Sequence, residues 1–149
     1  MSDMDPFIQS ITVEIDAPAD FVWDVLTDVP RYPEWNPFTR KVVTDFAIGG
    51  AVRLTVPDSN GSDELFEFDE YLRTFEPPKL LAWGIPDYAL REQIVTPLGP
   101  DRCAYHSTDR WFGDGVADYV NHGDYVQRGF DSVALALKAR VEVLRATTG

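Results

Sequence analysis

The clearest pattern of apolar and polar positions lies near the end of the chain, from Ala117 to Ala146. At about 100° per residue the apolar positions fall on one narrow stripe, with charged residues opposite. The stripe consists of Tyr119, Gly123, Val126, Phe130, Val133, Leu137, Val141 and Leu144. No proline interrupts the segment, and Gly113 and Gly115 precede it as a turn. The pattern predicts one long amphipathic helix.

The two halves of this stripe differ in character. From Val133 onward the residues are aliphatic, which is typical of a helix packed against a sheet. Before that point, aromatic side chains alternate with Gly123, which has no side chain. A helix that packs at one end and leaves room at the other predicts a ligand pocket beside its first half.

Most of the chain before this helix has the periodicity of strands. Phe7 to Asp16 alternates, with Ile11, Val13 and Ile15 on one face. The further predicted strands are Thr39 to Phe46, Ala51 to Val56, Glu64 to Phe75, Leu80 to Ile85, Leu90 to Thr96 and Arg102 to Phe112. Pro57 to Ser62 is the most turn-like stretch.

Two short helices are predicted after the first strand. Ala17 to Asp20 begins a helix that continues through Thr27, and the prolines at 30, 33 and 37 keep the next stretch short and irregular. Consecutive strands joined by tight turns predict an antiparallel sheet. The sequence therefore predicts an α+β fold in which one curved sheet wraps the long helix, with residues 1–149 forming a single domain.

Composition and charge exclude several classes of partner. The net charge of −12 makes nucleic acid or an anionic membrane an unfavourable partner, because phosphate binding needs clustered cations. Cys103 is the only thiol, so an intrachain disulfide and a thiolate zinc cluster are excluded. The N-terminal residues lack the basic and apolar parts of a signal peptide, and no apolar run reaches membrane-spanning length. We expect a cytoplasmic protein without membrane insertion, as a monomer or homodimer.

The sequence from Ile15 to Asp28 (IDAPADFVWDVLTD), followed by YPEWNPF from Tyr32 to Phe38, resembles the opening of the START/Bet v 1-like (SRPBCC) superfamily. It is most similar to the polyketide cyclase/dehydrase branch. Glu76 to Trp83 resembles that branch's proline-terminated strand and its successor, and Gly129 to Glu142 resembles the end of its final helix. The resemblance implies a helix-grip fold, with a seven-stranded antiparallel sheet around the C-terminal helix and a cavity between them.

The same resemblance says less about activity. Members bind lipids, plant hormones, polyketides or other apolar molecules, and some cyclise or dehydrate them. No catalytic signature runs through the superfamily, so the fold does not supply a reaction.

The last predicted strand carries the most informative polar pattern. Related proteins often have His-x-Glu-x-Phe-x-Gly here, and Ser107, Asp109, Trp111 and Gly113 occupy those four places. The acid and the aromatic residue are retained in kind, whereas serine replaces histidine, which weakens a proton-transfer role implied by the resemblance. Alternation along the strand places Tyr105 on the same face. We therefore expect Tyr105, Ser107, Asp109 and Trp111 to face the cavity.

A carboxylate inside a cavity needs a cation or hydrogen-bond donors. Arg91, on the preceding predicted strand, is the natural partner of Asp109, because a guanidinium can hold a carboxylate with two hydrogen bonds. Such a pair has two interpretations. It is either an orienting or acid/base pair, or a structural ion pair.

Other ionisable residues give weaker signals. Glu64, Glu67, Asp69 and Glu70 form an acidic run that is most simply a solvated face. The histidines have no metal-ligand spacing. A glycine-rich phosphate loop, a nucleophile elbow and a His-Glu-x-x-His motif are all absent from the sequence, so we expect no metal and no cofactor.

Aromatic residues are the strongest sign of binding, because an apolar ligand needs aromatic walls with a few polar groups. The alternative is that these rings simply fill the core. The predicted ligand-binding residues are Trp35, Phe38, Phe66, Phe68, Trp83, Arg91, Tyr105, Ser107, Asp109, Trp111, Tyr119, Gly123, Val126 and Phe130.

The sequence favours a protein that binds a hydrophobic, aromatic or polyketide-like small molecule in an internal cavity. A second hypothesis is a cofactor-independent polyketide cyclase or dehydratase, with Arg91, Tyr105 and Asp109 as candidate catalytic residues. A third is a regulatory or chaperone-contact module of the same fold. That module needs an exposed apolar patch, for which Leu135 on the polar side of the long helix is the only sign.

Overall fold

One antiparallel sheet and one long helix dominate the computed structural model, which describes residues 6–59 and 64–148. The elements, in chain order, are β1 (Phe7–Gln9), β2 (Val13–Ile15), α1 (Ala19–Thr27), η1 (Val29–Glu34), β3 (Lys41–Val43), β4 (Ala51–Pro57), β5 (Leu65–Glu76), β6 (Leu80–Ile85), β7 (Ala89–Gly99), β8 (Arg102–Trp111), η2 (Gly113–Gly115) and α2 (Val116–Thr148). Residues 60–62 of the turn-like stretch from Pro57 to Ser62 lie outside the described residues.

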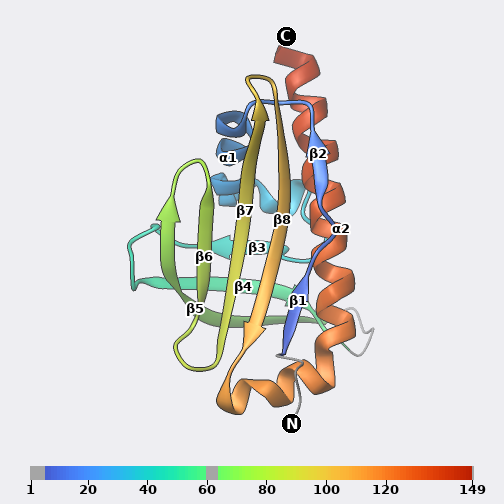
Figure 1. The fold of residues 1–149 in the computed structure, drawn as a ribbon. Coiled ribbons are helices and arrows are strands. Elements are labelled where there is room, and N and C mark those ends of the chain that lie inside the picture. The colour runs from blue at the N-terminus through green and yellow to red at the C-terminus, as the bar shows by residue number, and fades with distance from the viewer. Residues whose placement is uncertain (1–5, 60–63, 149) are drawn as a thin grey trace.

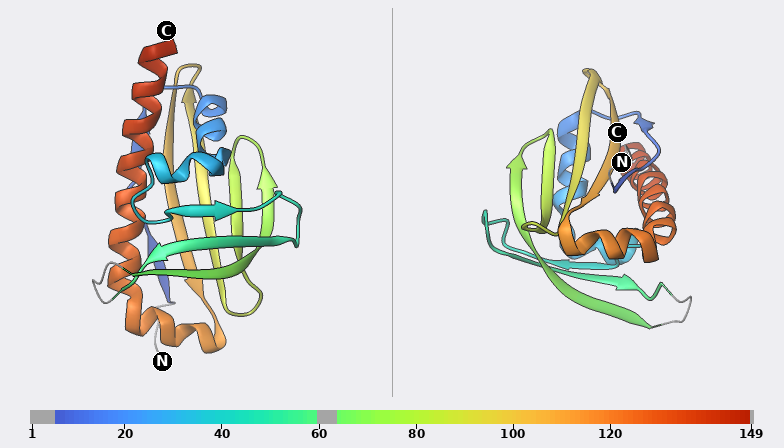
Figure 2. Two further views of the ribbon diagram at one scale, coloured as in Figure 1. Left: turned by 180° about the vertical axis from the view of Figure 1, so that it is seen from behind. Right: turned by 60° about the horizontal axis from the view of Figure 1, so that its bottom comes forward.

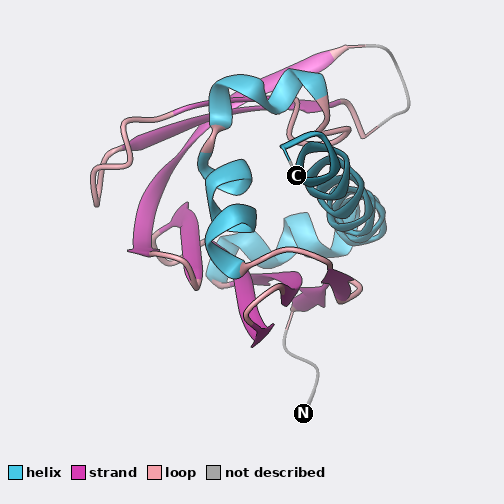
Figure 3. Cartoon of the chain, turned by 90° about the horizontal axis from the view of Figure 1, so that it is seen from above, coloured by secondary structure: helices cyan, strands magenta, loops and turns pink. Residues whose placement is uncertain are grey.

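The sheet is strongly curved. Its strands pair in the order β1-β8-β7-β6-β5-β4-β3, and β2 also pairs with β8. β3, β4 and the first part of β5 run across the long strands β7 and β8 (Figure 1). β5 bends near a register shift between Leu72 and Thr74, as expected because a bulge bends the strand that contains it. Seen from above, strands surround the short helices on several sides and α2 stands on the remaining side (Figure 3). The predicted α+β helix-grip fold is confirmed.

The first strand differs from the prediction. Gln9 pairs with Thr108, and Val13 pairs with Tyr105. The two pairs are therefore four residues apart in the N-terminal segment but only three residues apart on β8. The extra residue breaks the strand into β1 and β2 and changes which residues face inward. Ile11 is therefore 42% exposed, although the alternation placed it inside with Val13.

The predicted strand from Thr39 to Phe46 is also shorter than expected. Only Lys41–Val43 is strand, because Phe46 has a positive φ of 58°, which ends the extended conformation. The Thr44 hydroxyl accepts a hydrogen bond from the Phe46 amide and holds this turn.

The long helix is confirmed and has two parts. Its first turns run across the end of the sheet, and the remainder then runs along the sheet (Figures 1 and 2). Val133, Leu137 and Val141 are buried, as the aliphatic half of the stripe predicts. No helix among the described residues is long and apolar enough to cross a membrane.

Two apolar clusters fill the space between sheet and helices. One cluster packs α1 and the second half of α2 against the sheet, and it includes Trp23, whose ring lies edge-on to Phe75 at 5.5 Å. The other cluster gathers Phe38, Trp111 and Phe130 near the bend of α2. This second cluster forms part of the wall of the candidate site.

Candidate ligand-binding site

A cavity of about 620 Å³ lies between the curved sheet and the first half of α2. This volume is within the range of small-molecule sites in proteins. The residues that line it are Phe38, Thr39, Leu54, Val56, Pro57, Asp58, Ser59, Phe66, Glu67, Phe68, Glu70, Trp83, Ile85, Tyr88, Arg91, Asp109, Asp118, His122, Tyr125, Val126 and Phe130. Aromatic rings therefore come from β5, β6, α2 and the segments before β3 and β7.

The mouth of the cavity exposes large apolar side chains. Phe66 and Phe68 on β5 are 55% and 39% exposed, yet both line the cavity. Across the mouth, the Tyr125 hydroxyl of α2 donates a hydrogen bond to the Pro57 carbonyl at the end of β4. Apolar surface left open beside a cavity is typical of a ligand-binding site.

The Phe38 ring forms part of the cavity wall and lies against Gly129 of α2. It stacks edge-on against Tyr125 at 5.3 Å and against Phe130 at 6.1 Å. A Cβ atom on Gly129 would lie 2.6 Å from Cγ and Cε1 of Phe38. The ring therefore lies directly on the helix backbone, and only glycine leaves room for it there.

Arg91 is the buried cation of the site, with 7% of its surface exposed. Its Nη1 donates to the Thr39 hydroxyl at 3.3 Å, and its guanidinium carbon lies 4.2 Å from the centre of the Phe130 ring. Stacking on an aromatic face stabilises a guanidinium. Among the described residues, Nε and Nη2 of Arg91 have no hydrogen-bond partner.

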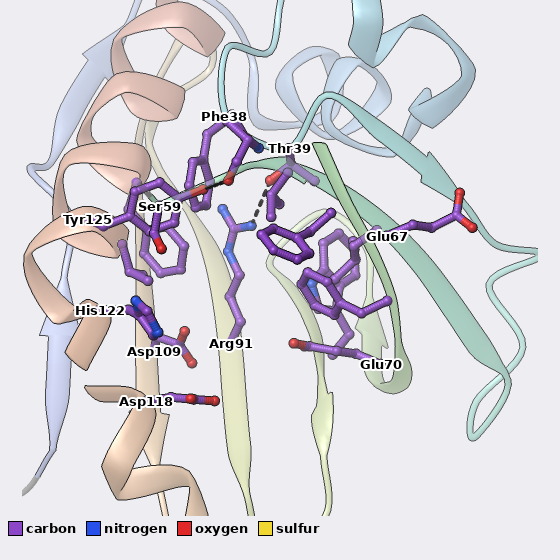
Figure 4. Close-up of a pocket in the computed structure, with 18 of the residues that line it drawn as sticks. Phe38, Thr39, Ser59, Glu67, Glu70, Arg91, Asp109, Asp118, His122 and Tyr125 are labelled. Atoms are coloured by element: carbon purple, nitrogen blue, oxygen red, sulfur yellow. Dashed lines mark hydrogen bonds between the residues drawn. The ribbon is translucent and has the colours of Figure 1, made fainter. Parts of the chain in front are cut away.

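Asp109 lies directly across from Arg91 in the β7–β8 register, but the predicted ion pair is wrong. The Arg91 side chain extends towards Thr39 instead of towards the carboxylate (Figure 4). The buried Oδ1 of Asp109 has no hydrogen-bond partner among the described residues. Burial holds the pKa of Asp109 well above its ordinary value, the Glu70 carboxylate raises the pKa further, and Arg91 opposes both effects.

Glu70 is a cavity residue that the sequence analysis assigned to a solvated face. The carboxylates of Asp69 and Glu67 do face outward. They lie 3.0 Å and 3.8 Å from Arg53, and the Glu67 carboxylate points away from the cavity that the residue borders (Figure 4). Glu70 shares the strand parity of Phe66 and Phe68 and is half-buried beside them. Burial raises its pKa to about 7, and Arg91 opposes this shift. Because side chains alternate along a strand, the even-numbered spacing of Phe66, Phe68 and Glu70 was the sequence signal that could have placed Glu70 in the cavity.

A third carboxylate enters from α2. The Tyr88 hydroxyl donates a hydrogen bond to Asp118 Oδ2, and this bond raises the pKa of Tyr88. His122 lies one helical turn after Asp118 and also lines the cavity. Asp118 and His122 were not predicted to face the cavity. The apolar stripe contains Tyr119 and Gly123, each one residue further along the helix.

Several predicted binding residues do line the cavity, namely Phe38, Phe66, Phe68, Trp83, Arg91, Asp109, Val126 and Phe130. The others lie in the surrounding core. Trp35 packs on Tyr32 at 5.1 Å, and Trp111 packs on Tyr119 at 5.4 Å, beside Gly123.

Tyr105 and Ser107 also lie outside the cavity lining and are fully buried. The Tyr105 hydroxyl donates to Gln93 Oε1 at 2.7 Å. The inward face of β8 is thus divided, because Asp109 reaches the cavity whereas Tyr105 belongs to the packed core. Of the candidate catalytic residues, only Arg91 and Asp109 can meet a ligand in the cavity.

Metal-ligating clusters are not found in the part of the chain that the structure describes. No group of three or more histidine, cysteine, aspartate or glutamate side chains there is placed to hold a metal ion.

Comparison with protein families gives one match that spans most of the chain. The model of the family described as polyketide cyclase / dehydrase and lipid transport matches residues 9–142. The chain belongs to this family. A search of curated proteins found no match.

Solved structures agree with this membership at the level of the fold. The chain is similar to the Zhui aromatase/cyclase of a Streptomyces species, with 23% identity and a TM-score of 0.68 over 91% of this chain and 93% of that one. A START superfamily protein of Mycobacterium smegmatis has 21% identity and a TM-score of 0.65, covering 93% of this chain and 98% of that one. A Nitrosomonas europaea protein has 14% identity and a TM-score of 0.73, covering 94% and 96% of the two chains.

Membership of the polyketide cyclase / dehydrase and lipid transport family supports hydrophobic-ligand binding or polyketide cyclase activity. The geometry of this member adds a cavity with aromatic walls, five acidic residues and one buried arginine.

Proposed function

We propose that this family member binds an apolar, aromatic small molecule in the cavity between the sheet and α2. The single observation that carries the proposal is the aromatic lining, which continues from buried Trp83 and Phe130 to Phe66 and Phe68 at the open mouth. Rings that remain exposed at a cavity mouth gain burial only when a ligand covers them. Cytoplasmic location and a monomeric or homodimeric state stay predictions.

The test uses N-phenylnaphthylamine, an uncharged dye whose fluorescence rises in apolar sites. Phe68→Ala removes a ring at the mouth, and we expect roughly fivefold weaker dye binding because one aromatic contact is lost. The matched control is Phe112→Ala, since Phe112 is 40% exposed but does not line the cavity. Absence of dye binding, or equal weakening by both substitutions, would contradict the proposal.

A cofactor-independent cyclase is the second candidate function, and the pKa of about 7 for Glu70 favours it. A carboxylate with this pKa can both accept and return a proton near neutral pH. In such a reaction Glu70 accepts the α-proton of a ketone, and the electron pair moves to the ketone oxygen, which accepts a hydrogen bond from Arg91. The enolate carbon then forms a bond to a second carbonyl carbon, and Glu70 returns the proton to the new alkoxide.

The proton-abstraction step can be tested separately with acetylnaphthalene in heavy water. A working base exchanges the acetyl protons for deuterium, which proton NMR measures. We expect Glu70→Gln to lower this exchange by roughly 100-fold, because general base catalysis contributes at least that factor. The matched control is Asp69→Asn, which removes the same charge from the outer face. Exchange at the rate without protein would contradict the cyclase candidate and leave the binding function standing.

A further inference from the structure

Three of the acidic residues that line the cavity come from three different elements. Glu70 comes from β5, Asp109 from β8 and Asp118 from α2, and all three are half-buried. In the view of Figure 4 they lie around the lower part of the cavity. The Arg91 guanidinium lies at the upper part, next to Thr39.

Arg91 opposes the raised pKa values of Glu70 and Asp109 only in part. Arg91 is the only lysine or arginine that lines the cavity in the part of the chain that the structure describes. Arg91 is buried, its guanidinium lies against Phe130, and Nε and Nη2 have no hydrogen-bond partner among the described residues. Asp109 Oδ1 is buried and likewise has none among the described residues, and such an atom is costly unless something binds it.

We propose that the ligand of this cavity is an aromatic molecule that carries a protonated amine, with its nitrogen held by Glu70 and Asp109. The proposal rests on the proposed binding function and names the class of its ligand. An ammonium group beside Glu70 and Asp109 supplies a cation and the hydrogen-bond donor that Asp109 Oδ1 lacks among the described residues.

Other features of the molecule favour the same ligand class. The aromatic faces of the cavity attract cations. The net charge of −12 concentrates cations near the protein and raises their rate of association. The other titratable groups that face the carboxylates are Arg91 on β7, Tyr88 before β7, His122 and Tyr125 on α2, and Asp58 after β4. Because burial raises the pKa of Glu70 to about 7, amine binding should strengthen as the pH rises through neutrality.

The experiment displaces bound N-phenylnaphthylamine with three ligands of one shape. Naphthylethylamine is a cation, naphthylethanol is its neutral counterpart and naphthylacetate is an anion. We expect the amine to displace the dye at a concentration at least about tenfold below that of the alcohol, since hydrogen bonds between charged groups are strong. The anion should be the weakest. The preference for the amine should grow from about pH 5.5 to about pH 8, where the amine stays protonated.

Substitutions then locate the preference. Glu70→Gln and Asp109→Asn should each lower the amine-to-alcohol affinity ratio by roughly fivefold or more. Asp69→Asn, which removes the same charge outside the cavity, should leave the ratio unchanged. Circular dichroism checks that each variant is folded, and the pH series of the unmodified protein needs no variant.

The outcomes separate this inference from the function on which it rests. A dye that binds but is displaced as well by the alcohol or the anion overturns the amine proposal and leaves the binding function intact. The amine proposal is also overturned if neither Glu70→Gln nor Asp109→Asn lowers the amine-to-alcohol affinity ratio. A dye that does not bind the unmodified protein overturns the proposed function, and the amine proposal with it.

Discussion

Whether Gly129→Ala stabilises or destabilises the protein depends on one contact in the cavity wall. In an ordinary helix, Gly→Ala stabilises a protein by about 1 kcal/mol, because alanine loses less backbone entropy on folding. At Gly129 the new methyl group would lie 2.6 Å from Cγ and Cε1 of Phe38, far inside van der Waals contact. Either the ring or the helix must therefore move.

The ring has little freedom to move. Phe38 is 8% exposed and is confined by Tyr125 and Phe130, and its backbone amide donates a hydrogen bond to Asn36 Oδ1 at 3.0 Å. Overpacking of a core typically costs about 1–3 kcal/mol. This cost cancels or exceeds the gain in helix propensity, so Gly129→Ala is expected to destabilise by up to about 2 kcal/mol.

Gly123→Ala is the matched control on the same helix. The nearest atom to its new methyl group is Tyr119 Cδ1 at 3.5 Å, which is ordinary contact, so a gain of about 0.5–1 kcal/mol is expected. Urea unfolding measures both free energies, and dye binding should weaken only in Gly129→Ala, because Phe38 lines the cavity. Combining Gly129→Ala with Phe38→Leu should recover part of the lost stability. If Gly129→Ala is as stable as Gly123→Ala, Phe38 does not lie on the helix as described.

Two further substitutions test the cavity acid and the packed half of α2. Burial raises the pKa of Glu70 from 4.5 to about 7, so the folded state holds this proton more tightly and stability falls as the pH rises between those values. Glu70→Gln should therefore stabilise the protein by about 1–3 kcal/mol at about pH 8 and by little at about pH 4, and a gain independent of pH would refute this reasoning. Leu137→Ala should cost about 2–5 kcal/mol in urea unfolding because Leu137 is fully buried. Leu135→Ala should cost less than about 0.5 kcal/mol because Leu135 is 56% exposed, and similar losses would contradict the orientation of α2.

Periodicity predicted the fold well because each element buries one face. The helical repeat of α2 and the turns between consecutive strands are local properties that the sequence displays directly. The bulge after Gln9 could not be predicted in this way, since it depends on how β1 and β2 pair with β8, more than ninety residues away. One extra residue there moved Ile11 from the inner face to the outer face.

The site was predicted less completely, and Arg91 and Asp109 show why. Strand order placed them on neighbouring strands, and the register puts them opposite each other. Whether two such side chains meet depends on competing partners, and Thr39 and Phe130, from distant parts of the chain, hold the guanidinium instead. Glu70 was missed for a different reason, because a run of acids was interpreted by its composition although strand parity separates Glu70 from Asp69.

The walls of the cavity are held apart by features that each prevent a different kind of collapse. Close packing is the usual state of a protein interior, so an open volume needs rigid surroundings. The bend in β5 keeps the outer strands away from α2, and the bond from Tyr125 to Pro57 fixes the span across the mouth. Apolar side chains could still close over the lower part, but that would bury Glu70 and Asp109 more deeply, at a large cost in desolvation. The carboxylates therefore help to keep the cavity open. On this argument, replacing both acids with leucine should shrink the cavity and weaken binding of the neutral dye, whereas the amide replacements should leave its volume unchanged.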